Sequence, residues 1–132
     1  MSMNDPISDL LTRIRNSSMV NKPWVDIPCS NQKIRILFIL KEENFIRDYV
    51  KIKDDKQGIL RIYLKYDYSN KSVIHGITRI STPGCRRYVP VDKIPRVLNG
   101  MGISIIATSK GVVSNKKAKF LNVGGEVLCH VW

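Results

Sequence analysis

The C-terminal third of the chain opens with the stretch ISIIATSKGVV, residues 103–113, and continues through SNKKAK, residues 114–119, to NVGGEVLCHVW, residues 122–132. The apolar runs in the first and last stretches predict two β-strands, and the middle stretch predicts a short helix between them. A hydroxyl pair, Thr108 and Ser109, ends the first apolar run. A rigid strand thereby presents small hydrogen-bonding groups beside positive charge, which suits recognition of the edges and sugars of an irregular nucleic acid.

The hydroxyl pair also has a local interpretation. Two hydroxyl residues after a strand most often form a turn in which their side chains bond the neighbouring backbone. Their position before Lys110 and a glycine favours the surface role, because glycine permits close backbone approach. The double glycine at 124–125 predicts that Glu126 lies near the same turn. A carboxylate there is reasonable if it accepts from a base amino group or holds neighbouring side chains in place.

Residues 73–102 read as short strands and turns, with strands predicted at residues 73–80 and 86–89. Three arginines and a tyrosine flank the intervening Pro-Gly turn: Arg79, Arg86, Arg87 and Tyr88. Guanidinium groups suit bidentate phosphate contact, and the tyrosine can stack on or hydrogen-bond to a nucleotide. A second basic cluster contains Lys116, Lys117 and Lys119. Each cluster alone is also consistent with a solvated charged surface.

The N-terminal half predicts a helix, a strand, a second helix and two further strands. Pro6 suits the first position of the opening helix, with Asp5 or Asn4 as its cap, and apolar residues then recur at helical spacing. Residues 22–27 are extended, and Ser30 caps the second helix. Two alternating segments around a polar turn complete this half.

These elements define an α+β fold with two small lobes. We expect residues 1–66 to form an N-terminal mixed α/β lobe and residues 73–132 to form a C-terminal, mainly β lobe with short helices, which would carry the surface that binds nucleic acid. The polar residues 67–72 are the expected linker.

Composition indicates a folded protein with a polyanionic partner. Of the 132 residues, 43% are hydrophobic, and 22 Lys and Arg outnumber 11 Asp and Glu to give a net charge of +11. The apolar content is sufficient for a core, so the chain is not a disordered basic tail. A charge excess this large on a small domain favours nucleic acid as the partner. A merely soluble basic protein is the alternative that charge alone leaves open.

Other partners and compartments are disfavoured. No secretory signal is visible, and no apolar run approaches the ~20 residues that a membrane-spanning helix needs. The three cysteines are widely spaced and contain no C-x-x-C pair, which argues for a reducing compartment and against a disulfide framework or a zinc site. The expected location is the cytoplasm or an organelle matrix, without membrane contact.

Signals for catalysis are weak. His75 and His130 fall in predicted strands with no carboxylate at a suggestive spacing, and both P-loop and dinucleotide fingerprints are absent. We therefore predict no catalytic residues, no cofactor and no metal. One enzyme alternative stays open, in which the Ser109-Lys110-Gly111 segment is a loop that binds a small phosphate ligand.

The chain resembles the eighth protein of the small ribosomal subunit, of bacterial or organellar type, over essentially its whole length. The segments that carry the resemblance are DPI at 5–7, LTRIRN at 11–16, LKEE at 40–43, RIS at 79–81, TSKG at 108–111 and GGE at 124–126. The resemblance implies a structural ribosomal protein that binds the central domain of small-subunit rRNA early in assembly of the platform. Neighbouring small-subunit proteins would be further partners, and bacterial members can also bind and repress the messenger of their own operon.

The resemblance also implies which residues contact RNA. Thr108, Ser109 and Lys110 would reach the irregular rRNA helix, with Glu126 supporting them. The other contacts that the resemblance implies are Arg86 and Tyr88 from the C-terminal lobe and, to the RNA backbone, Asp5, Thr12, Arg15, Asn16 and Ser30. Lys116 is a further expected contact, from the second basic cluster. This chain departs from the family at Ala107, where serine is usual, and at His130, where tyrosine is usual. The loss of one hydroxyl predicts a cost of about 0.5–1.5 kcal/mol, which would weaken binding without abolishing it.

Two alternatives within nucleic-acid binding stay open. A dedicated messenger-binding repressor on the same scaffold would not sediment with small subunits at moderate salt. A general packing protein would not distinguish folded rRNA from random duplex.

Overall fold

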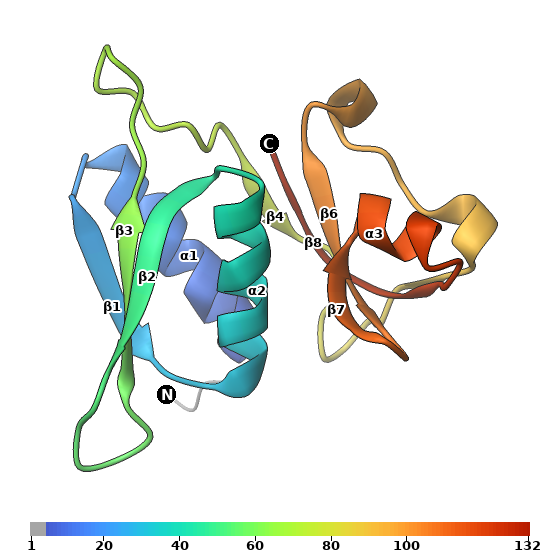
Figure 1. Ribbon diagram of the computed structural model, residues 1–132, viewed down its shortest axis with the longest axis horizontal. Coiled ribbons are helices and arrows are strands. Elements are labelled where there is room, and N and C mark those ends of the chain that lie inside the picture. Colours follow the sequence, from blue (N-terminus) through green and yellow to red (C-terminus); the bar gives the residue numbers. More distant parts are fainter. Residues whose placement is uncertain (1–4) are drawn as a thin grey trace. The chain divides into compact units, whose positions relative to one another are not determined.

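The computed structural model of the chain describes residues 5–132, so Asn4, the alternative cap of the opening helix, lies outside it. The described chain forms two compact units: one is Asp9–His75, and the other is Gly76–Trp132 with the N-terminal residues up to Ser8. Helices and antiparallel sheets make up both units (Figure 1), which confirms the α+β prediction. The lobe boundaries at residues 66 and 73 remain predictions, because a compact unit need not fold independently.

Helix α1 spans Pro6–Met19 and begins at the predicted residue. The Asp5 carboxylate accepts a hydrogen bond from the Ser8 backbone N–H at 3.2 Å, which makes Asp5 the cap of the helix. The apolar residues that recur at helical spacing are all buried: Ile7, Leu10, Leu11 and Ile14.

A three-stranded antiparallel sheet forms the centre of the Asp9–His75 unit. Its strands are β1 (Trp24–Pro28), β2 (Ile46–Ile52) and β3 (Ile59–Leu64), in the order β1-β3-β2. Helices α1 and α2 (Asn31–Glu42) cover one face of this sheet (Figure 1). The core side chains come from both helices and from the alternate strand positions that face them: Leu10, Leu11, Ile14, Ile27, Ile36, Leu37, Leu40, Leu60, Ile62 and Leu64.

Two cations satisfy carbonyl groups along β1, which is an edge strand. Arg13 donates to the Asp26 carbonyl at 3.1 Å, and the Lys33 ammonium donates to the Pro28 carbonyl at 3.0 Å. Burial lowers the pKa of Lys33. Ser30 accepts from the Lys33 backbone N–H at 3.3 Å, so it caps α2 as predicted. Both helices are therefore fastened to the sheet edge, and these carbonyls are not free to pair with another strand.

A second antiparallel sheet forms the centre of the other unit. Its path runs β4-β8-β6-β7, and β5 also pairs with β8. The strands are β4 (Ile77–Arg79), β5 (Tyr88–Val89), β6 (Ile103–Thr108), β7 (Gly111–Ser114) and β8 (Gly125–Val131). Two short 3-10 turns, η1 (Val91–Lys93) and η2 (Leu98–Gly100), connect β5 to β6.

Helix α3 (Asn115–Phe120) follows β7, as the sequence predicts. Ser114 caps it by accepting from the Lys117 backbone N–H at 3.2 Å. Three buried side chains form a core cluster in this unit: Ile94, Ile106 and Ala118. Among residues 5–132, no helix is long and apolar enough to cross a membrane.

The strands on either side of Pro83 are shorter than predicted. Pairing covers Ile77–Arg79 instead of residues 73–80, and Tyr88–Val89 instead of residues 86–89. Val73 donates to the Lys65 carbonyl at 3.2 Å, so the start of the predicted strand belongs to the first unit. Thr82 and Cys85 exchange backbone hydrogen bonds of 3.1 Å with each other, which closes a local turn.

Candidate nucleic-acid interface

The turn between β6 and β7 is closed by the side chain of Thr108. Its hydroxyl donates to the Gly111 carbonyl at 2.8 Å and accepts from the Lys110 backbone N–H at 3.1 Å. The hydroxyl of Thr108 therefore shapes the turn, which is the local interpretation of the motif. Ser109 and Lys110 are exposed at the tip. The Lys110 N–H is already bonded within the turn, so it is not available to a phosphate ligand in this conformation.

Glu126 lies in a row of residues across the sheet beside this turn. It is opposite Ala107 on β6 and opposite Tyr88 on β5, so the three side chains share one face. Tyr88 is an exposed residue, at 70%, whereas only 16% of the Glu126 side chain is exposed. The exposed Tyr88 ring and the shielded Glu126 carboxylate thus lie next to each other, in the row that includes Ala107, directly before the hydroxyl turn.

The double glycine permits this arrangement. A Cβ at Gly125 would lie 2.2 Å from the Ala107 carbonyl oxygen, and a Cβ at Gly124 would lie 2.3 Å from the Val89 carbonyl oxygen. Both contacts are with backbone, so neither can be relieved by a side-chain rotation. The glycines let β8 approach the strands on either side of it at the level of Glu126.

The Glu126 carboxylate holds neighbouring side chains in place. One oxygen, Oε2, accepts hydrogen bonds from the Ser81 hydroxyl and from Arg86, the latter at 3.0 Å. Ser81 is buried and also accepts from the Arg87 backbone N–H at 3.2 Å. The carboxylate thereby joins β8 to the segment that carries Arg86, and it orients that guanidinium.

Sequence reasoning did not identify Ser81 as part of this site. From the sequence, Ser81 is assigned only to the turn near Pro83, because the charged residues that flank this turn give the stronger signal. The signal that could have found it is a small polar residue directly before a Pro-Gly turn and between strands that converge on Glu126.

Six predicted site residues therefore lie in one unit, on the strands and turn just described or, for Arg86, in the segment that leads into β5: Thr108, Ser109, Lys110, Glu126, Arg86 and Tyr88. Lys116 belongs to the same unit and is exposed in the first turn of α3. The residues predicted from the opening helix lie in the Asp9–His75 unit, where Thr12, Arg15 and Asn16 share one side of α1 by their three- and four-residue spacing. Ser30 is exposed in the same unit, and its hydroxyl caps α2.

Asp5 is engaged by protein groups. Its carboxylate accepts from the Ser8 hydroxyl at 2.7 Å and from Arg79 at 3.1 Å, and the Asp5 and Arg79 side chains are only 16% and 10% exposed. Arg79 also donates to the Leu128 carbonyl at 2.8 Å. Burial favours the neutral form of Asp5, but the hydrogen bonds from Ser8 and Arg79 outweigh it, so the pKa of Asp5 is lowered. Asp5 thus ties the start of α1 to β4 and β8.

Replacing Asp5 by alanine is expected to lower the free energy of unfolding by about 1–2 kcal/mol at neutral pH, because the helix cap and the partner of Arg79 are lost. The pKa of Asp5 is lower in the folded state than in the unfolded state. Ionised Asp5 therefore stabilises the fold above about pH 4, and this contribution disappears as the pH falls through the folded pKa. Urea unfolding of both proteins at pH 7 and near pH 3 measures the difference, which should shrink in acid.

Asp55→Ala is the matched control for this prediction, because Asp55 is an exposed carboxylate in a turn. Equal destabilisation by the two substitutions, or a difference that is the same at both pH values, would contradict the role assigned to Asp5.

The two residues at which the sequence departs from the pattern it resembles, Ala107 and His130, lie on the same sheet. Ala107 is half-buried and leads into the hydroxyl turn. His130 is half-buried on β8 opposite Ser104, and burial lowers its pKa, which favours the neutral ring. Among residues 5–132, no group of three or more His, Cys, Asp and Glu side chains is placed to hold a metal ion.

Comparison with known proteins gives one consistent result. A family model described as Ribosomal protein S8 matches residues 5–132. Proteins named "Small ribosomal subunit protein uS8" are 56% identical in Lacticaseibacillus casei, 54% identical in Syntrophotalea carbinolica and 51% identical in Staphylococcus carnosus. Each alignment runs over 132 residues and covers the whole of both chains. The similarity therefore includes both units and every candidate site residue.

Proposed function

Since the chain belongs to the ribosomal protein S8 family and is a structural protein of the small ribosomal subunit, we propose that it binds the rRNA of that subunit directly, in its central domain and early in assembly. The observation that supports this proposal best is the exposed tip of the β6–β7 turn. It projects Ser109 and Lys110 from a rigid sheet. Ala107, two residues before Ser109, pairs with Glu126, which in turn pairs with Tyr88. Small donors and acceptors on a rigid support suit the shape of an irregular RNA helix.

Some of these side chains would recognise the shape of the RNA, and others would bind its phosphates. The Ser109 hydroxyl would bond a sugar or a base edge, and Tyr88 would stack on or hydrogen-bond to a nucleotide. Arg86, held by Glu126, would contact phosphate together with Lys110. Thr108 would act by fixing the turn. Phosphate contacts position the protein, while the turn reads the folded shape.

The remaining predicted residues would contact the RNA backbone. Lys116 would add positive charge in the unit that carries the turn, and Thr12, Arg15, Asn16 and Ser30 would contribute from the other unit. Asp5 would act indirectly, by fixing the first turn of α1. In the assembled subunit, neighbouring small-subunit proteins are further partners. Binding of its own messenger would use the same turn, so messenger and rRNA fragment should compete.

A titration tests the proposal. The protein is mixed with a central-domain rRNA fragment and with a scrambled fragment of equal length, at 50 mM and at 200 mM salt. We expect affinity for both RNAs to fall steeply with salt, because counterions are released from phosphates. The preference for the folded fragment should persist at the higher salt. Equal binding of both fragments would contradict the proposal and favour a general packing protein.

The double variant Thr108→Ala/Ser109→Ala is expected to reduce the preference for the folded fragment about tenfold, because it removes both the Ser109 hydroxyl that would contact the RNA and the Thr108 hydroxyl that closes the turn. The slope of affinity against salt should stay the same, since no positive charge is removed. Thr108→Ser is the control, because it keeps the hydroxyl that closes the turn. An unchanged preference in the double variant would mean that the turn does not recognise shape.

A further inference from the structure

The Asp9–His75 unit contains a basic hairpin, none of whose residues has so far been assigned a contact with RNA. It joins β2 to β3 and presents Lys51, Lys53 and Lys56, which together we name the lysine hairpin. Two hollows share this turn. The larger has a volume of about 400 Å³ and is bounded on its other side by Arg13, and the smaller has a volume of about 250 Å³ and contains all three lysines in its wall.

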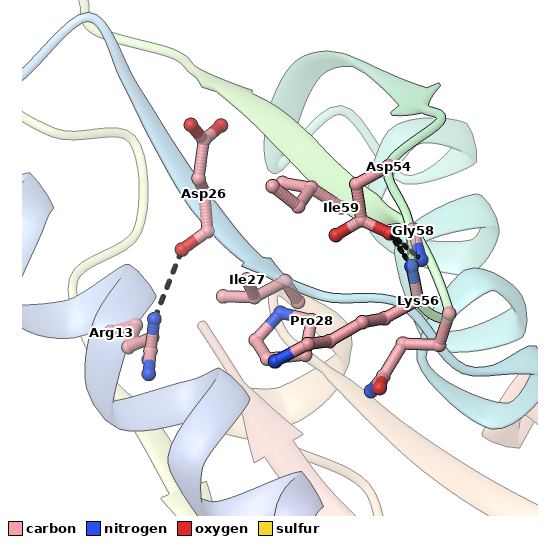
Figure 2. A pocket seen from close by; sticks show the side chains of 9 residues that line it. Arg13, Asp26, Ile27, Pro28, Asp54, Lys56, Gly58 and Ile59 are labelled. Atoms are coloured by element: carbon pink, nitrogen blue, oxygen red, sulfur yellow. Dashed lines mark hydrogen bonds between the residues drawn. The ribbon is translucent and has the colours of Figure 1, made fainter.

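The larger hollow has a cation on each side. Its floor is the end of β1, at Ile27 and Pro28. Figure 2 shows the Arg13 side chain reaching it from α1, while the Lys56 side chain extends over Pro28 from the hairpin. Lys56 also lines the smaller hollow, so the two hollows adjoin at this residue.

The carboxylates that border the hollows are already used by protein groups. Asp26 receives two hydrogen bonds from Arg61, at 3.0 and 3.1 Å. One oxygen of Asp54 accepts from the backbone N–H groups of Lys56 and Gly58, both at 2.8 Å (Figure 2). The charge of Asp26 is therefore compensated by Arg61, and the bonds to Asp54 fix the turn that carries Lys53 and Lys56.

The ammonium groups of the lysine hairpin have no such partners. Lys51, Lys53 and Lys56 are exposed, and within residues 5–132 none of their ammonium groups makes a hydrogen bond or an ion pair. The turn itself is held to the rest of the unit. Cys29 donates its N–H to the Gly58 carbonyl at 2.9 Å, and Gly58 has a φ of +96°, a conformation that favours glycine.

We propose that the lysine hairpin and Arg13 form a second RNA contact, which binds consecutive phosphates of an RNA backbone without reading sequence. The inference rests on the proposed function, because it requires the chain to bind RNA. Three unpartnered ammonium groups, one at the end of β2 and two on the fixed turn, supply point charges for phosphates. Across the hollow, the Arg13 guanidinium pairs through Nε with Asp9 at 3.0 Å and through Nη1 with the Asp26 carbonyl at 3.1 Å, so its remaining N–H groups are the ones that would face a phosphate. Two adjoining hollows that share Lys56 suit a continuous strand of phosphates better than one isolated anion.

The experiment compares two triple variants in the titration against the rRNA fragment. For Lys51→Gln/Lys53→Gln/Lys56→Gln we expect the salt dependence of log affinity to lose about two to three units of slope, because two to three phosphate contacts are removed. Affinity at 50 mM salt should fall about tenfold or more, while the preference for folded over scrambled fragment is unchanged. The control is Lys22→Gln/Lys65→Gln/Lys71→Gln, which removes the same charge from the same unit and should cost less than about half as much slope.

The outcomes separate the two proposals. An equal loss of slope in both variants would mean that only the overall charge matters, and an unchanged slope in the hairpin variant would mean that no phosphate binds there; either result overturns the inference. Failure of the wild-type protein to prefer the folded fragment would instead overturn the proposed function, while the difference in slope between the two variants would still be readable.

A second measurement locates the contact directly. An iron chelate is attached to Gln57→Cys in a Cys85→Ser background, since Cys85 is the exposed native cysteine. Hydroxyl radicals generated at the turn should cut the bound rRNA fragment over a few consecutive nucleotides. The absence of cleavage, in a complex that forms with wild-type affinity, would overturn the inference.

Discussion

Gly125→Ala is expected to destabilise the unit that carries the hydroxyl turn by about 3 kcal/mol or more. The new Cβ would lie 2.2 Å from the Ala107 carbonyl oxygen and 3.1 Å from the Thr108 Cα, and both atoms belong to the backbone of β6. Strand β8 can accommodate the methyl group only by moving away from β6. That movement would displace Glu126 from its place opposite Ala107 and separate it from the turn. We therefore also expect at least tenfold weaker binding of the folded rRNA fragment, measured after confirming that the variant is folded at the temperature of the titration.

Gly84→Ala is the matched control. Gly84 lies in the turn before Arg86, its φ is not in the left-handed region, and a Cβ there would meet no atom within 4 Å. Its unfolding free energy should stay within about 0.5 kcal/mol of the wild-type value. If thermal or urea unfolding gave similar values for the two variants, close approach of β8 to β6 would not be the reason for glycine at position 125.

The elements with strong local signals could be predicted from the sequence. Helix α1 begins after Asp5 because a capping carboxylate, a proline at the first position and apolar residues at helical spacing all agree. The cap of α2 at Ser30 and the β6–β7 turn follow from signals equally short in sequence. Each of these features is decided by residues within a few positions of one another, so no tertiary information is needed.

The contacts that define the candidate interface instead join residues that are far apart in the sequence. Ser81 and Glu126 are 45 residues apart, and Asp5 and Arg79 are 74 residues apart. Nothing in either segment specifies its distant partner, so the network around Glu126 appears only when β8 has paired with β5 and β6. The same reason explains why strands β4 and β5 were predicted too long, since their limits are set by bonds to distant strands and by the turn at Thr82.

Removal of the Glu126 carboxylate should weaken RNA binding, although it removes a negative charge from a protein that binds a polyanion. The chain has a net charge of +11, and Glu126→Ala would raise it to +12 because one negative charge is lost. Charge alone predicts slightly tighter binding. The structure predicts the opposite, because Ser81 would lose the acceptor of its buried hydroxyl and Arg86 would lose the group that orients it. An unsatisfied buried hydroxyl costs about 1–3 kcal/mol, so the unfolding free energy should fall as well.

We expect Glu126→Ala to bind the folded rRNA fragment about tenfold more weakly than the wild type, and Glu126→Gln to be intermediate, since the amide oxygen can still accept from Ser81. The titration at 50 mM salt measures both. Combination with Arg86→Ala then tests how the carboxylate acts. If Glu126 contributes by holding Arg86, the two substitutions remove the same contact, and the double variant should lose clearly less affinity than the product of the single losses. Additive losses would mean that Glu126 acts on the RNA independently of Arg86. Tighter binding by Glu126→Ala would mean that repulsion of phosphates outweighs its role as a support.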